Sequence, residues 1–570
     1  MDDLKPLKIL LINSFCGVKG GAAGKYQLDG ILNGRTRDNP AESLFDDVGP
    51  STRDSRLQSS AGAVRRPRMP GAYIMADRLR KKGHYVDILE YIGFWTQEEL
   101  VRWAKHHKRP FDVIGVSTTF LYGPSHIASI ITRFKQLFPQ AVIVTGGLTP
   151  PPADVDANYS VVGYGEHALL GIIDHHFYKK HQLKFTISNK TKVIDADTFY
   201  STHLENQDYM YEFHEHDLWH IPGETPMLEL SRGCPFACKF CSYPLLGMKE
   251  DTSIGEEQLY RFLQSAYDNH GFTEFGLSDD TVNSRTETLQ RLVRVVNRLS
   301  FTPRFGGYAR LELMKTHPEQ IQLACEAGFH YMQFGIDTLH QPTGKVIGKG
   351  MHKDHVYHTL DNIYSHFKQS GERLFVQGNL ICGLPKLSLE QMESDTQELV
   401  QFSREREWFL STITHSLFIG YDATKKAVSA FGVDLAKYGY SSMTEQEILQ
   451  KIIELKPADQ SLESIGARLK MWAPFMTFWK NEHTNFFDNF MFTQYLMKEY
   501  GGYGTDRPGS WAIGTWDFSN SELVTFDNPT DNLAPFYIRP RIEHNDTFKT
   551  YIKEKLLHTA VNSHLIPNTV

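Results

Sequence analysis

The sequence predicts an α/β protein in three parts: a doubly wound parallel sheet, a full or partial barrel of βα units, and a mostly helical, aromatic-rich C-terminal region. Two observations lead to this prediction. Short apolar runs alternate with helical patterns through roughly the first 400 residues, and near-continuous apolar strands separated by helices are typical of parallel sheets. Beyond about residue 430, helical stretches alternate instead with clusters of Phe and Trp.

The first part, residues 1–185, has the rhythm of a Rossmann-like domain. We expect strands at 8–13, 85–90, 112–118 and 141–145, and helices at 72–82, 97–108 and 124–138. Such a sheet binds ligands at the carboxyl ends of its strands. Residues 27–70 are rich in Ser, Arg, Asp, Gly and Pro and too long for a normal βα loop. We expect them to be a lid or a disordered insertion.

The remaining chain is predicted to hold a connector, a barrel and a C-terminal region. Residues 186–225 are polar and predict a connector. Residues 226–425 resume the βα rhythm, with strands expected at 227–231, 274–277, 304–308, 331–336 and 374–381. Five or six βα units over about 200 residues predict a full or partial barrel. Residues 426–570 are predicted to pack on that barrel as a separate helical region.

Composition narrows the class of protein. The chain has 570 residues, 41% hydrophobic and 22% charged, which excludes a collagen-like or wholly disordered chain. Its formal charge of −7 offers no basic field for nucleic acid, so no nucleic-acid partner is expected. No apolar run approaches the ~20 residues of a membrane span, and the N-terminus lacks a signal peptide's features. We expect a cytoplasmic protein with no membrane partner.

Three of the six cysteines form a cluster with metal-binding character. Cys234, Cys238 and Cys241 follow a predicted strand with the spacing C-x3-C-x2-C. Three thiolates on one loop can bind three irons of a 4Fe–4S cubane, which leaves the fourth iron open to another ligand. A structural zinc site is normally closed by a fourth Cys or His at short spacing, whereas the next cysteine is Cys325. The alternative is a zinc or redox cysteine cluster.

This stretch resembles the signature of the radical S-adenosylmethionine (radical SAM) superfamily, in which an aromatic residue precedes the last cysteine. Phe240 occupies that position. The resemblance implies a TIM-type barrel whose open iron chelates SAM. It also implies reductive cleavage of SAM to a 5′-deoxyadenosyl radical, with electrons from an external one-electron reductant such as flavodoxin or ferredoxin.

The resemblance continues along the barrel and implies SAM contacts at the ends of several strands. Leu277 stands where the related F-x-D-D segment has its aromatic residue, and Asp337 is shorter than the usual Glu. A surface ion pair for Arg310, and a buried thiol for Cys382, are the plainer interpretations. The residues so assigned to SAM are Asp279, Asp280, Arg310, Gly335, Asp337, Cys382 and Gly383.

Three short segments of the first part of the chain contain glycine: 115–117, 146–150 and 162–166. These segments resemble the cobalamin-binding-type domain of a large radical SAM subclass. The D-x-H-x-x-G motif that supplies an axial histidine in other cobalamin proteins is absent, as in many members of the subclass. The alternative is a Rossmann-like domain retained for packing or substrate capture. The resemblance assigns cobalamin contacts to Ser117, Thr118, Gly146, Gly147, Gly163, Gly165 and Glu166.

Together these resemblances imply a cobalamin-dependent radical SAM methyltransferase that acts on an unactivated carbon or phosphorus of a small-molecule or peptide substrate. One alternative is a radical SAM cyclase, epimerase or oxidoreductase that works without cobalamin. Another is a non-catalytic iron–sulfur or SAM-binding sensor. Methylthiolation is disfavoured, because that family needs three N-terminal cysteines and only Cys16 is available.

Overall fold

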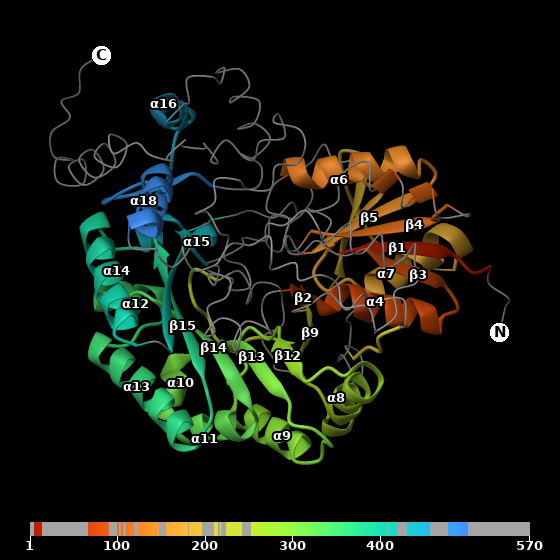
Figure 1. The fold of residues 1–570 in the computed structure, drawn as a ribbon. Coiled ribbons are helices and arrows are strands. Elements are labelled where there is room, and N and C mark those ends of the chain that lie inside the picture. The colour runs from red at the N-terminus through yellow and green to blue at the C-terminus, as the bar shows by residue number, and fades with distance from the viewer. Residues whose placement is uncertain are drawn as a thin grey trace.

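Two seven-stranded sheets form the frame of the protein, which we describe from a computed structural model (Figure 1). The class is α/β, as predicted. The structure describes residues 5–13, 66–89, 100–101, 104–105, 110–118, 124–147, 156–180, 182–196, 210–214, 217, 224–241, 252–406, 408–417, 419, 430–455 and 477–499. Most of the segment 27–70 and the chain after residue 499 lie outside these residues. No helix within the described ranges combines the length and hydropathy of a membrane span.

The first sheet has the strand order β3-β1-β4-β5-β6-β8-β7. All neighbouring strands are parallel except the β7–β8 hairpin. Helices α4 and α7 cover one face and α6 covers the other (Figure 1). The bounds are β1 Lys8–Ile12, β3 Tyr85–Leu89, β4 Val113–Ser117, β5 Val142–Gly147, β6 Tyr159–Val162, β7 Thr186–Ser188, β8 Thr191–Asp195, α4 Pro70–Lys81, α6 Pro124–Leu137 and α7 Glu166–Ile173, with the π-helix η3 Asp174–Tyr178 following α7.

The apolar run of β1 follows from this double cover. Ile9 and Leu11 belong to the core that includes α4, whereas Leu10 and Ile12 belong to the core that includes α6. Because side chains of a strand alternate between faces, a strand buried on both faces must be apolar at every position.

The first sheet extends beyond the predicted boundary at residue 185. The β7–β8 hairpin lies within residues 186–225, which the sequence predicted as a connector, and β8 pairs in parallel with β6. Both strands are short and rich in Thr, Ser and Lys, so they lack the apolar pattern of a buried strand. The strand β6 was also missed, since it has only four residues.

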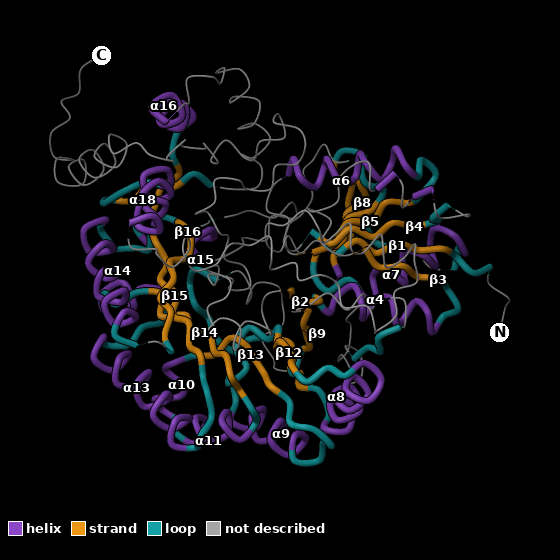
Figure 2. The backbone as a smooth tube through the Cα atoms, in the orientation of Figure 1, coloured by secondary structure: helices purple, strands orange, loops and turns teal. Residues whose placement is uncertain are grey.

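The second sheet has the order β16-β15-β14-β13-β12-β9-β2, with parallel neighbours throughout. It curves into the predicted partial barrel, with the helices on its outer side (Figure 2). Its strands are β2 Arg66–Arg68, β9 Glu224–Leu228, β12 Glu274–Leu277, β13 Arg304–Ala309, β14 Phe329–Asp337, β15 Phe375–Cys382 and β16 Phe409–Ser416. Its helices are α8 Glu256–His270, α9 Thr286–Val296, α10 Leu311–Thr316, α11 Glu319–Glu326, α12 Gln341–Ile347, α13 Lys353–Gln369 and α14 Leu389–Arg404.

Strand β2 comes from the end of the segment 27–70, which the sequence predicted as a lid or insertion. Its residues pair with β9, and helix α4 begins at Pro70 directly after them. The chain therefore enters the second sheet before it completes the first. Aromatic side chains also join the two parts, because Tyr73 of α4 stacks on Tyr211, whose ring contacts Phe262 of α8.

The described part of the C-terminal region packs on the last barrel strands. It contains α15 Ala430–Val433, the 3-10 turn η7 Ala436–Tyr438, β17 Tyr440–Ser442, α16 Glu445–Leu455, β18 Trp479–Asn481 and α18 Phe486–Glu499. Strands β17 and β18 form an antiparallel pair, which the prediction of a mostly helical region did not include. Buried Trp479, Phe486 and Phe487 share one apolar core with Cys382 and Leu384.

Candidate active site

The three clustered cysteines lie on one loop that follows β9. The loop opens with the short strand β10 (Ser231–Arg232), which pairs with β11 (Thr252–Ser253). Gly233 then adopts a left-handed conformation with φ of 102°, which favours glycine at this position. Cys234, Cys238 and Cys241 are half-buried free thiols. The turn is closed by a hydrogen bond from Cys241 N to Cys238 O of 3.1 Å, and Lys239 N donates to Ile347 O at the end of α12.

The backbone N–H of Phe236 donates to the Cys234 sulfur. The nearby Thr281 hydroxyl donates to Asp280 O over 2.6 Å. Burial raises the pKa of the Cys234 thiol, and the hydrogen bond from Phe236 opposes this shift. Such donors stabilise a thiolate ligand and are among the contacts that set the potential of iron–sulfur clusters. Within the described residues, no three His, Cys, Asp or Glu side chains converge as ligands of one metal ion. In a cubane, each thiolate binds a different iron.

Arg310, at the end of β13, lies against the cysteine loop. Its Nη1 donates to Cys238 Sγ over 3.3 Å, and its guanidinium carbon is 4.0 Å from the centre of the Phe236 ring. The Arg310 backbone is held by two hydrogen bonds with the Asn283 side chain. Its ion pair with Glu312 is long, at 3.6 Å. The structure therefore places Arg310 beside the cysteine loop, and its assignment to SAM stays a prediction.

Asp337 and Gly335, at the carboxyl end of β14, contact a lysine that sequence analysis missed. Lys349 Nζ lies 2.7 Å from the Asp337 carboxylate and donates to Gly335 O over 2.7 Å. Burial lowers the pKa of Lys349, but the Asp337 and Glu312 carboxylates outweigh it, so its pKa is raised. The sequence signal is the Gly348-Lys349-Gly350 triplet, and both of these glycines have positive φ in the structure.

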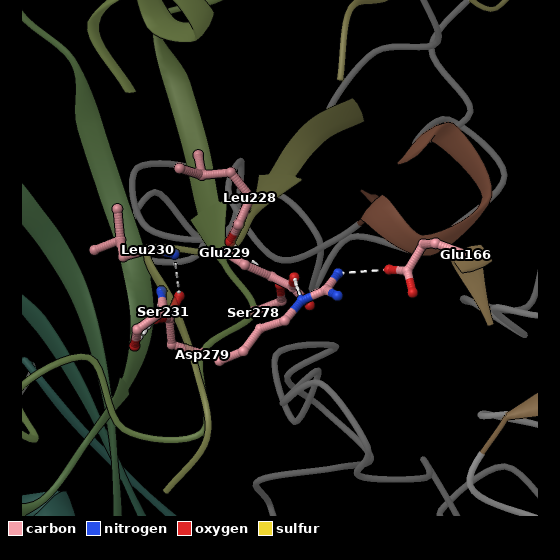
Figure 3. A network of polar contacts seen from close by, with 8 residues as sticks. Glu166, Leu228, Glu229, Leu230, Ser231, Ser278 and Asp279 are labelled. Carbon is pink, nitrogen blue, oxygen red and sulfur yellow. Dashed lines mark hydrogen bonds and ion pairs between the residues drawn. The ribbon is translucent and has the colours of Figure 1, made fainter. Parts of the chain in front are cut away.

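Asp279 holds the base of the cysteine loop. Its carboxylate accepts hydrogen bonds from Leu230 N, Ser231 N and Ser231 Oγ, at 2.8, 2.7 and 2.8 Å (Figure 3). Burial raises its pKa to about 7 despite these donors. Both oxygens are thus engaged in the protein, which differs from the SAM contact assigned to this residue. The neighbouring Asp280 is exposed, and its charge acts on Cys234.

Cys382 and Gly383 are covered by the C-terminal region. Cys382 is fully buried next to Thr493 of α18, and burial raises its pKa to about 12. Gly383 has φ of 82°, and a Cβ added there would come within 2.7 Å of the Trp479 ring. Its carbonyl accepts a hydrogen bond from Tyr440 Oη of 2.9 Å. The simpler interpretation of Cys382 as a buried thiol fits this environment better than a SAM contact.

Neutral polar side chains line the face of the barrel sheet that is turned away from the helices. Tyr331 donates to Gln377 and, more weakly at 3.5 Å, to Gln333, while Gln377 donates to Asn379 over 3.2 Å. The opposite face carries Met332, Phe334 and Val376 in the apolar core. Sequence analysis did not single out Tyr331, Gln377 or Asn379, although polar residues at every second position of an apolar strand indicate a separate environment.

The residues assigned to cobalamin meet at one edge of the first sheet, except for Glu166. Ser117 pairs with Gly146 and Gly147 pairs with Val162 at the carboxyl ends of β4, β5 and β6. Thr118 N donates to Gly146 O over 2.7 Å. Gly147 and Gly163 have positive φ, so glycine is favoured where the chain leaves the sheet. Gly165 caps α7.

Glu166 forms a buried ion pair with the cysteine loop. Its Oε1 lies 2.6 Å from Arg232 Nη2, and Arg232 Nε lies 2.6 Å from Glu229 Oε2 (Figure 3). Burial alone would raise the pKa of Glu166, but Arg232 holds it below its usual value, whereas burial raises the pKa of Glu229. This contact engages the Glu166 carboxylate inside the protein, and the assignment of Glu166 to cobalamin stays a prediction. Sequence analysis missed Arg232 and Glu229, although charges beside an apolar strand were visible.

Comparison with known proteins identifies the barrel. Residues 228–399 match the sequence model of the radical SAM superfamily, so the predicted radical SAM domain is confirmed for the cysteine loop and for β12–β15. A radical SAM domain implies a 4Fe–4S cluster and SAM, the two cofactors predicted for the barrel. An uncharacterized methyltransferase of Pyrococcus horikoshii is 27% identical over 165 residues. That match covers 29% of this chain and 34% of the relative, so the chain spans about a third of that protein.

Two solved structures of the radical SAM methyltransferase TsrM from Kitasatospora setae share the fold. The one with tryptophan substrate and the SAM analogue aza-SAM has a TM-score of 0.52 at 14% identity, covering 77% of this chain and 78% of that chain. The one with cobalamin and a [4Fe-4S] cluster has a TM-score of 0.51 at 14% identity, covering 77% and 81%. At this identity the likeness shows the fold: a Rossmann-like domain followed by a TIM-type radical SAM domain.

Proposed function

We propose that this chain is a radical SAM enzyme whose 4Fe–4S cluster is held by Cys234, Cys238 and Cys241. The observation that carries the proposal is the loop itself: three half-buried thiols after a barrel strand, with Arg310 donating to one sulfur. When bound, the cluster supplies one electron to the sulfonium of SAM, and an external reductant restores it.

The chain's own residues hold and orient the groups around that reaction. The Phe236 N–H donates to Cys234 and Arg310 donates to Cys238, so each of these two sulfurs accepts a hydrogen bond that orients it. Asp279 fixes the backbone at the start of the loop. The buried charges of Asp337 and Lys349 lie at the carboxyl end of the barrel, where (β/α) barrels bind their substrates.

The reaction we propose is cobalamin-dependent methyl transfer to an unactivated carbon or phosphorus of a small molecule or peptide. Two features support it. The glycine-rich carboxyl edge of the first sheet is where sheets of this kind bind ligands. The ion pair from Glu166 to Arg232 brings this edge close to the cysteine loop. The fold likeness to TsrM, whose solved structure contains cobalamin and a [4Fe-4S] cluster, points the same way.

A second candidate is radical chemistry without cobalamin, such as cyclisation, epimerisation or oxidoreduction. The observation that favours it is the engagement of the Glu166 carboxylate by Arg232, because a residue assigned to cobalamin is thereby used inside the protein. In that case the first sheet would serve packing or substrate capture.

Anaerobic reconstitution tests both candidates. We expect about four irons per chain and formation of 5′-deoxyadenosine from SAM with dithionite, and loss of both in the Cys234→Ala/Cys238→Ala/Cys241→Ala variant. The Cys325→Ala variant is the matched control and should keep both. Full iron and activity in the triple variant would refute the site. Binding of about one hydroxocobalamin per chain, read from the absorption of desalted protein, would support methyl transfer, and none would favour the second candidate.

A further inference from the structure

We infer that Arg232 is a positioning residue that locks the cysteine loop to the ligand edge of the first sheet, and that Glu166 acts through it. The expected effect on SAM binding rests on the proposed function. The expected effect on the stability of the cysteine loop does not.

Arg232 is held from three directions. Its guanidinium donates hydrogen bonds of 2.6 Å to Glu229, which lies between β9 and β10, and to Glu166 at the start of α7. The Tyr164 ring lies 4.4 Å from the guanidinium carbon. The side chains of Arg232 and Glu166 are only 2% and 5% exposed. Arginine suits this place, because its planar fork can bond two carboxylates while its face packs on an aromatic ring.

These contacts join the two candidate ligand sites. On one side, Arg232 precedes Cys234 with only Gly233 between them. On the other, Tyr164 and Glu166 belong to the turn after β6 that contains Gly163 and Gly165. A shift of that turn by a ligand would therefore move the partners of Arg232. Packed, buried ion pairs have discrete arrangements and transmit such shifts rather than absorb them.

Charge makes the link specific. One guanidinium bonds two carboxylates, so neutralising Glu166 removes one of these two charges and keeps that of Glu229. Removing one partner of a buried pair is far more damaging than removing an exposed one. The Glu166→Gln variant keeps the size and one acceptor oxygen, so its effect isolates the charge. Because Glu166 lies outside the cysteine loop, any effect on that loop must cross the contact between the two parts.

The first experiment measures hydrogen exchange of the full chain by mass spectrometry. We expect Glu166→Gln to speed exchange at amides 229–241 by about tenfold or more, since the loop loses its outer support. Tyr164→Leu should also speed exchange at these amides, and it does not change the charge of a buried side chain. This variant replaces Glu166→Gln in the comparison if Glu166→Gln does not fold. Asp217→Asn is the matched control. It neutralises Asp217, a buried carboxylate that accepts hydrogen bonds of 2.7 and 2.8 Å from Arg80, and neither residue belongs to the cysteine loop.

The second experiment follows the reconstituted cluster by EPR while SAM is added. We expect the iron content of Glu166→Gln to match the wild type and its apparent SAM affinity to fall by about three- to tenfold, with Asp217→Asn unchanged. A role limited to local stability would lower thermal stability but leave this affinity alone.

The outcomes separate the inference from the proposed function. Unchanged exchange at 229–241 in both Glu166→Gln and Tyr164→Leu would overturn the inference, as would an equal change in Asp217→Asn. Weaker hydroxocobalamin binding in Glu166→Gln with unchanged hydrogen exchange of the loop would also overturn the inference. It would indicate instead that Glu166 contacts the cobalamin. If wild-type protein gives no SAM response, the proposed function fails, while the exchange comparison still decides the role of Arg232.

Discussion

Arg310 donates from Nη1 to the sulfur of Cys238 while its guanidinium packs on the Phe236 ring. One cation thus contacts both a proposed cluster ligand and the loop that carries it. Positive charge and N–H donors near cluster sulfurs stabilise the reduced, more negative state. The contact predicts that the protein tunes its cluster from strand β13.

Replacing Arg310 by Met should therefore lower the reduction potential of the cluster. We expect a shift on the order of 50 mV, which for one electron is about 1.2 kcal/mol, the net contribution of a typical hydrogen bond. An EPR-monitored redox titration measures it. Arg304→Met is the control, because Arg304 lies at the other end of β13 and pairs with Glu274. An equal shift in the control would mean that net charge, not the contact with Cys238, sets the potential.

Replacing Lys349 by Met should destabilise the fold by about 3–5 kcal/mol, because it leaves the buried Asp337 carboxylate unpaired. Their side chains are 8% and 6% exposed. The Asp337→Asn/Lys349→Met double variant should recover much of this loss. In contrast, Lys353→Met breaks an exposed pair with Glu398 and should cost less than about 1 kcal/mol. Urea unfolding measures all three, and equal losses in the two single variants would contradict the prediction.

Gly383→Ala should be more damaging than Gly439→Ala. Both glycines have φ near 80°, but an added Cβ meets the Trp479 ring at 2.7 Å in the first case and nothing within 4 Å in the second. The Gly439 variant therefore measures backbone strain alone, about 1 kcal/mol. The Gly383 variant adds a clash of about 1–3 kcal/mol and should loosen the C-terminal region. Thermal unfolding compares them, and similar melting temperatures would show that Trp479 moves freely.

His330 should make the protein less stable in mild acid. Burial lowers its pKa to about 3 in the fold, with the charge of Arg304 acting in the same direction. Below about pH 6.5, His330 binds a proton in the unfolded chain but stays neutral in the folded protein. Each further pH unit of acidification therefore lowers the free energy of unfolding by about 1.4 kcal/mol, down to about pH 3. In urea unfolding between about pH 7.5 and 5.5, His330→Leu should show a correspondingly weaker dependence. The same slope in both proteins would exclude His330 as the cause.

The sequence predicted the part of the site whose chemistry is local. The three cysteines fall within eight positions after an apolar strand, so their spacing alone predicts a metal-binding loop. The strands β1 and β4 were predicted close to their observed bounds for a similar reason, since a strand covered on both faces is apolar along most of its length.

What sequence analysis missed depends on contacts between distant residues. Glu166 and Arg232 are separated by 66 positions, and neither has a local pattern that names its partner. The motif around Glu166 pointed to a ligand, yet the fold turns its carboxylate toward the cysteine loop. The contacts of Asp279 likewise depend on residues distant in the sequence, because its carboxylate accepts from Leu230 and Ser231.

The pairing of β2 with β9 has a consequence for dividing the protein into fragments. A fragment that starts at the connector would contain the cysteines and every barrel helix, but it would lack the strand that covers β9. Exposed strand edges recruit other strands and promote aggregation. We therefore expect an isolated barrel to aggregate and to bind the iron–sulfur cluster poorly. A fragment that includes residues 66–68 would keep the strand that pairs with β9.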